Sequence, residues 1–196
     1  MLSAPRLAVR RAHGDETGFT LIELIISITI LGILMPAIAA AMFSALATNR
    51  STDVRLSESR DAREIAAYLP DDAAGATSFT TGGTSRCGAG GTVVLEFRGQ
   101  SFDAAQVAQT TVISYLLTTE TAEDGQATRV LHRFSCQTAA SPPVYPLSPT
   151  SDISLARYVS TTVDPTVLIA SATAQLTMTS RSGDLVTTVS GHRRTS

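Results

Sequence analysis

The chain has 196 residues, a net charge of −2 and 43% hydrophobic residues, so one membrane-directed segment leaves enough chain for a single modest soluble core. Its basic side chains are all arginines, and they are scattered along the sequence instead of forming a stripe. Nucleic-acid binding needs a concentrated positive surface, so this distribution argues against a role in binding nucleic acid.

A long apolar segment follows a short basic leader. Residues 1–18 are polar and contain three arginines, whereas residues 19–47 contain one charged side chain, Glu23. As a helix, the apolar segment would extend roughly 40 Å, which exceeds a hydrocarbon core of about 30 Å. We therefore predict a single-pass helix in the inner membrane, with the basic leader in the cytoplasm and the C-terminal bulk outside.

Two ordinary explanations of this segment remain open. A secretory signal could be cut at a small-residue site such as residues 37–39, but its apolar region usually has only about 7 to 15 residues. A plain membrane anchor could use Thr20 and Glu23 as a capping box, in which the two side chains satisfy free amides of the first turn. The anchor explains Glu23 but leaves the Gly18-Phe19 junction unexplained.

The run Gly18-Phe19-Thr20-Leu21-Ile22-Glu23, followed by an apolar helix, resembles the class III leader of type IV prepilins. The resemblance implies that prepilin peptidase cuts between Gly18 and Phe19 and that the new N-terminus at Phe19 is methylated. Glu23 then becomes the fifth residue of the mature chain. A membrane-embedded carboxylate costs about 2.5 to 3.5 kcal/mol, so it needs a partner. The resemblance implies that this partner is the α-amine of Phe19 in the same or a neighbouring subunit. It also implies that the pair sets the register of the subunits during assembly.

Two prolines are expected to interrupt the N-terminal helix. Pro36 removes one helical hydrogen bond and clashes with the carbonyl of Gly32, so the sequence predicts a kink or local melting at Gly32 and Pro36. Beyond residue 47, the spacing of apolar residues predicts a soluble amphipathic continuation of the helix over residues 48–70. We expect Pro70 to end this continuation.

Residues 71–196 are predicted to form an extracytoplasmic β-rich domain. Strict alternation over residues 92–98 predicts a strand with Glu96 and Arg98 on its polar face. Residues 110–120 and 127–136 are predicted to form an antiparallel hairpin, and a Pro-rich surface loop is predicted at residues 141–151. Strands are predicted to resume near residue 153 and to finish with a hairpin containing residues 175–178 and 185–189.

The resemblance implies an α+β, pilin-like fold, in which a long helix, half transmembrane, packs on a C-terminal antiparallel β-sheet domain. The order of helix and strands is loosely similar to that of the J-type pseudopilin of type II secretion and the W-type minor pilin. Cys87 and Cys136 both follow the apolar segment, where an oxidising exterior would allow them to pair. Such a disulfide would close a loop of about 50 residues and stabilise the fold by roughly 4 kcal/mol.

The sequence shows no motif for catalysis, a metal ion or a cofactor. The histidines do not fall at metal-ligand spacing, and neither a nucleophile elbow nor a phosphate loop is present. We therefore expect a non-enzymatic minor pilin or pseudopilin in a filament for pilus formation or secretion. The implied partners are prepilin peptidase, other pilin or pseudopilin subunits, the inner-membrane assembly platform and membrane lipid. The alternative is a membrane-anchored binding module or adhesin outside the cytoplasm.

Overall fold

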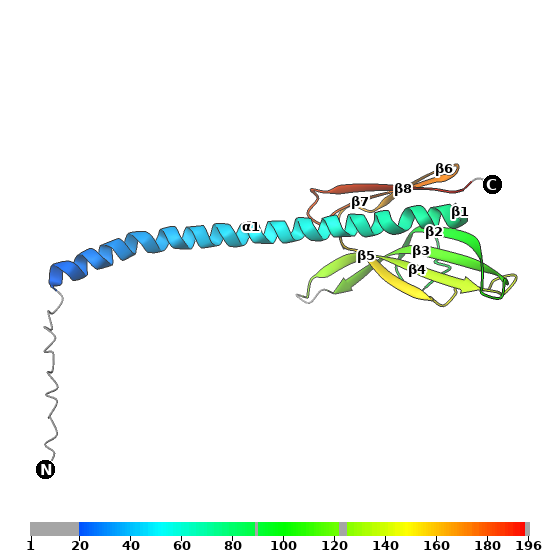
Figure 1. Cartoon of the computed structure of the whole chain (residues 1–196), viewed down its shortest axis with the longest axis horizontal. Coiled ribbons are helices and arrows are strands. Elements are labelled where there is room, and N and C mark those ends of the chain that lie inside the picture. Colours follow the sequence, from blue (N-terminus) through cyan, green and yellow to red (C-terminus); the bar gives the residue numbers. More distant parts are fainter. Residues whose placement is uncertain (1–19, 89, 122–124, 195–196) are drawn as a thin grey trace, which may run out of the picture. The chain divides into compact units, whose positions relative to one another are not determined.

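The computed structural model describes residues 20–88, 90–121 and 125–194, so the predicted leader and the Gly18-Phe19 junction lie outside the described residues. Within this part, the chain forms one helix, α1 (Leu21–Gly75), followed by strands (Figure 1). The strands are β1 (Ala76–Thr80), β2 (Thr92–Phe102), β3 (Ala108–Thr121), β4 (Ala127–Thr138), β5 (Ser151–Val159), β6 (Thr166–Ala170), β7 (Thr173–Thr179) and β8 (Val186–His192). The chain divides into two compact units, Met1–Arg50 and Ser51–Ser196, which we describe separately.

The part of α1 in the first unit is a continuous apolar helix. It remains helical at both Gly32 and Pro36, so of the two predicted alternatives local melting does not occur, and the kink stays a prediction (Figure 1). Gly32 has no side chain, and its carbonyl can tilt away from the proline ring without a clash between side chains. The helix therefore passes Pro36 at the loss of one backbone hydrogen bond.

The end of α1 lies five residues beyond the predicted one. Pro70 is helical, and the helix ends at Gly75. Pro70 leaves the carbonyl of Ala66 without its helical donor, but Ala66 is exposed and water can take the donor's place. Leu69 and Ala73 are fully buried on either side of the proline, so packing holds the last turn in helical form.

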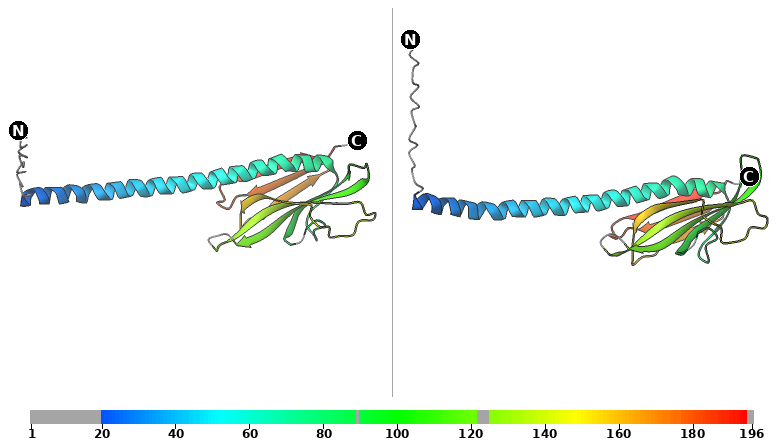
Figure 2. Two further views of the ribbon diagram at one scale, coloured as in Figure 1. Left: turned by 60° about the horizontal axis from the view of Figure 1, so that its bottom comes forward. Right: turned by 90° about the horizontal axis from the view of Figure 1, so that it is seen from below.

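Two antiparallel sheets make up the rest of the second unit. The first has the strand order β1-β2-β3-β4-β5, and the second has the order β6-β7-β8. Each strand pairs with its neighbour in the sequence, so every connection within a sheet is local. Figure 2 shows the two sheets from two further directions. The predicted antiparallel hairpin is confirmed as β3 and β4, and the predicted C-terminal hairpin as β7 and β8.

The hydrophobic core lies between the second half of α1 and both sheets. An edge-to-face row of rings runs through it, with ring centroids 5.3 Å apart for Phe79 and Phe97 and 5.7 Å apart for Phe97 and Tyr115. The buried residues that form this core include Ile65, Leu69, Ala73, Leu95, Phe97, Tyr115, Leu131, Leu155, Ala174, Leu176 and Met178. The fold is thus α+β, with a long N-terminal helix packed against antiparallel sheets.

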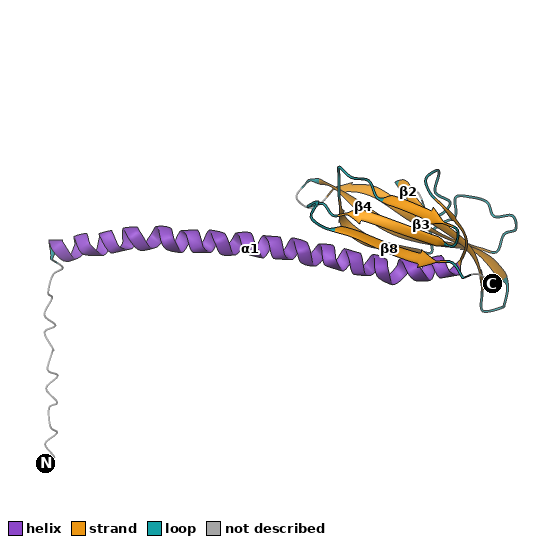
Figure 3. Cartoon of the chain, turned by 90° about the horizontal axis from the view of Figure 1, so that it is seen from above, coloured by secondary structure: helices purple, strands orange, loops and turns teal. Residues whose placement is uncertain are grey.

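Strand β8 runs beside the second half of α1 (Figure 3). The two elements approach each other closely at Gly191. A Cβ atom at this position would lie 2.5 Å from the Cβ of Ala73 and 2.8 Å from the carbonyl oxygen of Leu69. Both distances are too short for real contacts, so the absence of a side chain at Gly191 lets the second sheet pack directly on the helix.

Candidate functional site

The first turn of α1 is closed by Thr20. The carbonyl oxygen of Thr20 accepts hydrogen bonds from the backbone N–H groups of Glu23 at 3.0 Å and Leu24 at 3.2 Å. Its hydroxyl oxygen also lies 3.4 Å from the Glu23 nitrogen, as an N-cap side chain does. Thr20 is therefore the N-cap of α1, and Glu23 is the third helical residue.

The carboxylate of Glu23 is not used by this cap. It is exposed, and no residue in the described part of the chain donates a hydrogen bond to it or forms an ion pair with it. A full capping box would direct the carboxylate back to the Thr20 N–H, but only the threonine half of the box forms. The capping box thus explains Thr20 and leaves the charge of Glu23 available for a partner.

Glu23 lies within a band of exposed apolar side chains. Leu21, Ile22, Leu24, Ile25 and Ile26 are each more than half exposed. By length and composition, α1 is apolar enough to cross a membrane, and its most apolar stretch has no buried residue. Such a surface needs lipid or other apolar helices around it, and a carboxylate in that setting needs a cationic partner.

A buried ionic network holds the end of α1 to the first sheet. The carboxylate of Asp72 accepts hydrogen bonds from Arg133 Nε at 2.7 Å and Nη2 at 2.6 Å, and from the Tyr115 hydroxyl at 2.6 Å. The Arg133 guanidinium also lies 5.0 Å from the ring centroid of Tyr68. The hydrogen bonds that Arg133 donates to Asp72 raise the pKa of Arg133, whereas burial and the adjacent carboxylate raise the pKa of Tyr115. Both groups therefore keep their protons, and the network is structural.

The prediction that Glu96 lies on an exposed polar face of β2 is wrong. The sequence places it on a polar face, but its side chain is only 2% exposed. Its carboxylate accepts hydrogen bonds from Arg86 Nη1 at 2.6 Å, from the Arg86 backbone at 3.0 Å and from the Ser114 hydroxyl at 2.8 Å. The loop before β2 covers this face of the sheet, so the charge is buried together with its partners.

The disulfide between Cys87 and Cys136 is present, with the two Cα atoms 5.5 Å apart. It fastens the loop before β2 to the end of β4. Both cysteines belong to a small hydrophobic cluster with buried Val112, and the surrounding side chains are Phe134, Tyr145 and Leu147. This second cluster is separate from the main core, and the disulfide and the Arg86–Glu96 ion pair both link the loop to the sheet.

His132 lies between two carboxylates on the outer side of the first sheet. Its Nδ1 is 2.8 Å from Asp152, and its Nε2 is 2.8 Å from Glu120. Because the two carboxylates occupy opposite sides of the ring, they cannot share one metal ion with it. Among the described residues, no group of three His, Cys, Asp or Glu side chains could hold a metal ion.

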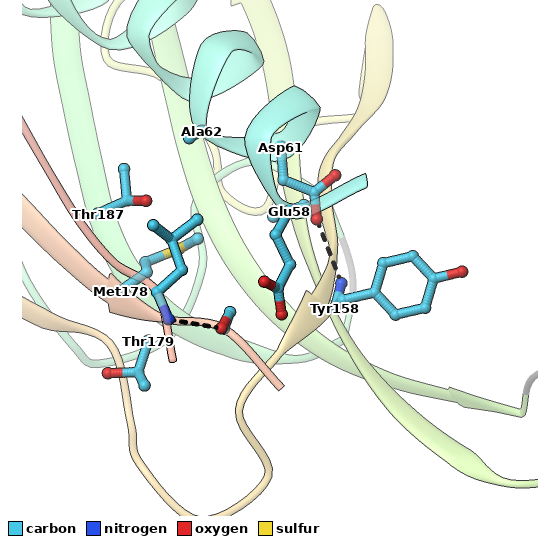
Figure 4. Close-up of a pocket in the computed structure, with 10 residues that line it drawn as sticks. Glu58, Asp61, Ala62, Tyr158, Met178, Thr179 and Thr187 are labelled. Atoms are coloured by element: carbon cyan, nitrogen blue, oxygen red, sulfur yellow. Dashed lines mark hydrogen bonds between the residues drawn. The ribbon is translucent and has the colours of Figure 1, made fainter. Parts of the chain in front are cut away.

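A water-sized pocket of about 20 Å³ lies between α1 and the strands that face it (Figure 4). Glu58 and Asp61, one helical turn apart, both line it. The carboxylate of Asp61 accepts hydrogen bonds from the backbone N–H groups of Arg157 at 3.0 Å and Tyr158 at 3.4 Å, and so covers the free edge of β5. Glu58 accepts a hydrogen bond from the Ser182 hydroxyl at 2.8 Å. These contacts connect α1 with both sheets.

Asp61 gives the domain a testable pH dependence. Burial is the main cause that raises its pKa, and the two backbone hydrogen bonds oppose this effect. Since the folded state holds the proton more tightly than the unfolded state, the Asp61 contribution to stability is complete at acidic pH and declines as pH rises through the raised pKa. We expect Asp61→Asn, which keeps an acceptor oxygen, to remove this decline.

The free energy of unfolding should be measured for both proteins from pH 3 to pH 8. The value for Asp61→Asn minus the value for the parent should increase as pH rises. Asp53→Asn on the exposed side of the same helix is the control, with the same loss of charge. A constant difference between Asp61→Asn and the parent across this range would contradict the assignment.

Comparison with known proteins identifies the N-terminal segment. Residues 15–35 match the prokaryotic N-terminal methylation motif, and this range contains Gly18, Phe19 and Glu23. No curated protein and no solved structure matches the chain. The motif supports a type IV pilin-like protein that is processed by prepilin peptidase and assembled with other pilins, and proteins with this motif are structural subunits instead of enzymes. The apolar helix that begins within this motif, at Leu21, is consistent with membrane anchoring.

Proposed function

We propose that this chain is a minor pilin or pseudopilin. Prepilin peptidase cuts it between Gly18 and Phe19 and methylates Phe19, and the mature subunit joins a type IV pilus or a type II secretion-like filament. Minor pilins commonly prime assembly from the filament tip, and by resemblance we assign this chain a tip or priming position. Its partners are the peptidase, other pilin or pseudopilin subunits and the inner-membrane assembly platform.

The observation that carries the proposal is the carboxylate of Glu23, which lies within the methylation motif and has no partner among the residues that the structure describes. Cleavage before Phe19 creates an α-amine, which is largely protonated near neutral pH. Glu23 projects from the first turn of α1 and is surrounded by exposed apolar side chains. An amine and a carboxylate in apolar surroundings are weakly screened, so the pair can set the register between subunits.

The orientation of the subunit follows from its charges. The basic leader stays in the cytoplasm, residues 19–47 cross the inner membrane, and the β-rich part is displayed outside. A disulfide between Cys87 and Cys136 agrees with this placement because such bonds persist in oxidising compartments. After assembly, the same helix forms the apolar interior of the filament.

The effect of Glu23→Ala tests the assembly role. A buried charge that loses its partner costs about 3 to 5 kcal/mol, so we expect the Phe19 amine to be left unpaired and incorporation into filaments to fall sharply. Cleavage and methylation of Phe19 should persist, since the junction is unchanged. The measurement is the fraction of mature protein in sheared filaments, from cells that contain the complete assembly machinery.

Leu24→Ala is the matched control, because it truncates the adjacent side chain without removing a charge. Normal incorporation of Glu23→Ala would refute the registering role. An anchored adhesin, in contrast, would remain in the membrane and never enter the filament fraction, with or without Glu23. Counting copies per filament separates a tip subunit, present once or a few times, from a repeating one.

A further inference from the structure

Strand β6 forms an open edge of the second sheet. It pairs with β7 on one side, and among the described residues no backbone group pairs with its other side. The edge of β5 is covered by the Asp61 carboxylate, and β8 packs against α1 at Gly191. Natural sheet edges are commonly protected by charge, proline or a bulge, but Thr166–Ala170 has none of these. Strand β6 therefore offers unpaired backbone groups to another chain.

The turn after β6 determines which of its backbone groups face outward. Ala170 pairs with Thr173, so the loop between β6 and β7 has two residues, and Ser171 at its first position has a φ of 51°. The residues that flank such a turn form a hydrogen-bonded pair, and bonded and non-bonded pairs alternate along an antiparallel ladder. The N–H and C=O groups of Val167 and Ile169 therefore point to the open edge.

Apolar side chains lie on both faces of β6. Val167 packs against the main core, so Ile169, two residues further on, lies on the same inner face. Ile169 is 37% exposed, and Leu168 on the outer face is 63% exposed. A groove of about 400 Å³ adjoins Val167, and Val93 and Leu117 also line it. The open edge is thus bordered by apolar surface that an added strand would cover.

The groove carries no net charge. The charged residues that line it are Arg129 and Asp164, and these two form an ion pair with each other. A further charged side chain brought into the groove would lose water without gaining a partner, which is costly. An occupant must therefore be uncharged where it meets the groove, and extended so that its backbone matches the free groups of Val167 and Ile169.

We propose that the open edge of β6 binds an extended, uncharged segment of another pilin-like subunit, which adds to the second sheet as a fourth strand. Backbone hydrogen bonds to Val167 and Ile169 hold the segment, while its alternate side chains enter the groove or cover Leu168. The inference rests on the proposed function, because assembly with other pilins brings a neighbouring subunit to this surface. The partner is a different chain, since a tip or priming subunit has no second copy beside it.

Photo-crosslinking in cells that assemble filaments tests the contact. The full-length precursor carries p-benzoyl-phenylalanine in place of Leu168, and a control precursor carries the same probe in place of Val144, which is 79% exposed outside the second sheet. We expect the probe at residue 168 to attach to another protein that has the N-terminal methylation motif. Mass spectrometry should locate the attachment in an uncharged stretch. The probe at residue 144 should not give this product.

Ile169→Pro tests the backbone hydrogen bonds, because it removes an N–H at the open edge and leaves the ladder with β7 intact. Ile169→Ala is the matched control, since it also shortens the side chain but keeps the N–H. We expect the proline variant to give about five-fold less crosslinked product than the alanine variant, the typical effect of one net hydrogen bond. Equal protease resistance of the two variants shows that both fold. If the proline variant does not fold, Thr166→Lys adds a charge to the same exposed edge and should lower the product instead.

Three results would overturn the inference. The probe at residue 168 could attach only to a second copy of this chain, it could attach to no pilin-like subunit, or Ile169→Pro and Ile169→Ala could give equal yields. The proposed function is judged separately, by whether the mature chain that begins at Phe19 is present in filaments. Its presence there without the crosslink refutes only the role of β6, whereas its absence from filaments refutes the proposed function.

Discussion

Asp72→Ala is expected to destabilise the folded domain by about 3 to 5 kcal/mol, because it leaves the charge of Arg133 buried without its partner. The Arg133 side chain is only 12% exposed, so water cannot replace the carboxylate. The Tyr115 hydroxyl, which donates to the same carboxylate, loses its acceptor as well. Chemical unfolding, monitored by the near-ultraviolet dichroism of tyrosine, measures the loss, since every tyrosine of the chain lies in the unit Ser51–Ser196.

The adjacent residue provides the control for Asp72. Asp71 is exposed, so Asp71→Ala should change the free energy of unfolding by less than about 0.5 kcal/mol. Asp72→Ala combined with Arg133→Met should be less destabilised than the sum of the two single variants, because the second change removes the unpaired charge. Equal losses for Asp71→Ala and Asp72→Ala would contradict the structural role of the network.

Removing the disulfide by Cys87→Ala with Cys136→Ala is expected to lower the free energy of unfolding by about 4 kcal/mol. The bond joins residues separated by 49 positions, so it strongly restricts the unfolded chain. The small cluster around Val112 and Tyr145 should loosen as well, because it lies apart from the main core. Urea unfolding of the parent and the double variant under oxidising conditions gives the difference.

A reducing agent separates the bond from the side-chain change. The parent should lose most of the same stability on reduction, whereas the double alanine variant should not respond. A loss below about 1 kcal/mol in both experiments would mean that the loop contributes little entropy to the unfolded state, contrary to the expectation.

The features that sequence predicts well here are local in the chain. The methylation motif, the N-cap at Thr20 and the apolar run lie within a few turns of one another. Strand alternation is also local, so the hairpin of β3 and β4 and the burial of Leu95 and Phe97 are confirmed. The pairing of Cys87 with Cys136 was expected because the chain contains only these two cysteines.

The errors arise where tertiary packing outweighs local preference. Pro70 ordinarily ends a helix, but burial of Leu69 and Ala73 extends α1 beyond it. The alternation of apolar and polar residues along β2 predicts that Glu96 is exposed, but the loop that carries Arg86 covers it. In each case the deciding contact comes from another part of the chain, and local periodicity contains no information about it.

The ionic network and strand β6 could not be predicted from the sequence for a similar reason. Asp72 and Arg133 are separated by 61 positions, and no spacing rule relates them. Two short strands, β1 and β6, have only five residues each, so their alternation is too brief to distinguish them from loops. Strand periodicity alone therefore does not show that the strands divide between two sheets.

The most direct test of the proposed function is the N-terminus of the mature protein. Mass spectrometry of the protein from cells with active prepilin peptidase should find a chain that begins at Phe19 and carries one methyl group on its α-amine. In cells without the peptidase, residues 1–18 should remain attached. Two results would contradict the account. One is a mature chain that keeps residues 1–18 although the peptidase is present. The other is a chain that begins after residue 39, as cleavage of a secretory signal would produce.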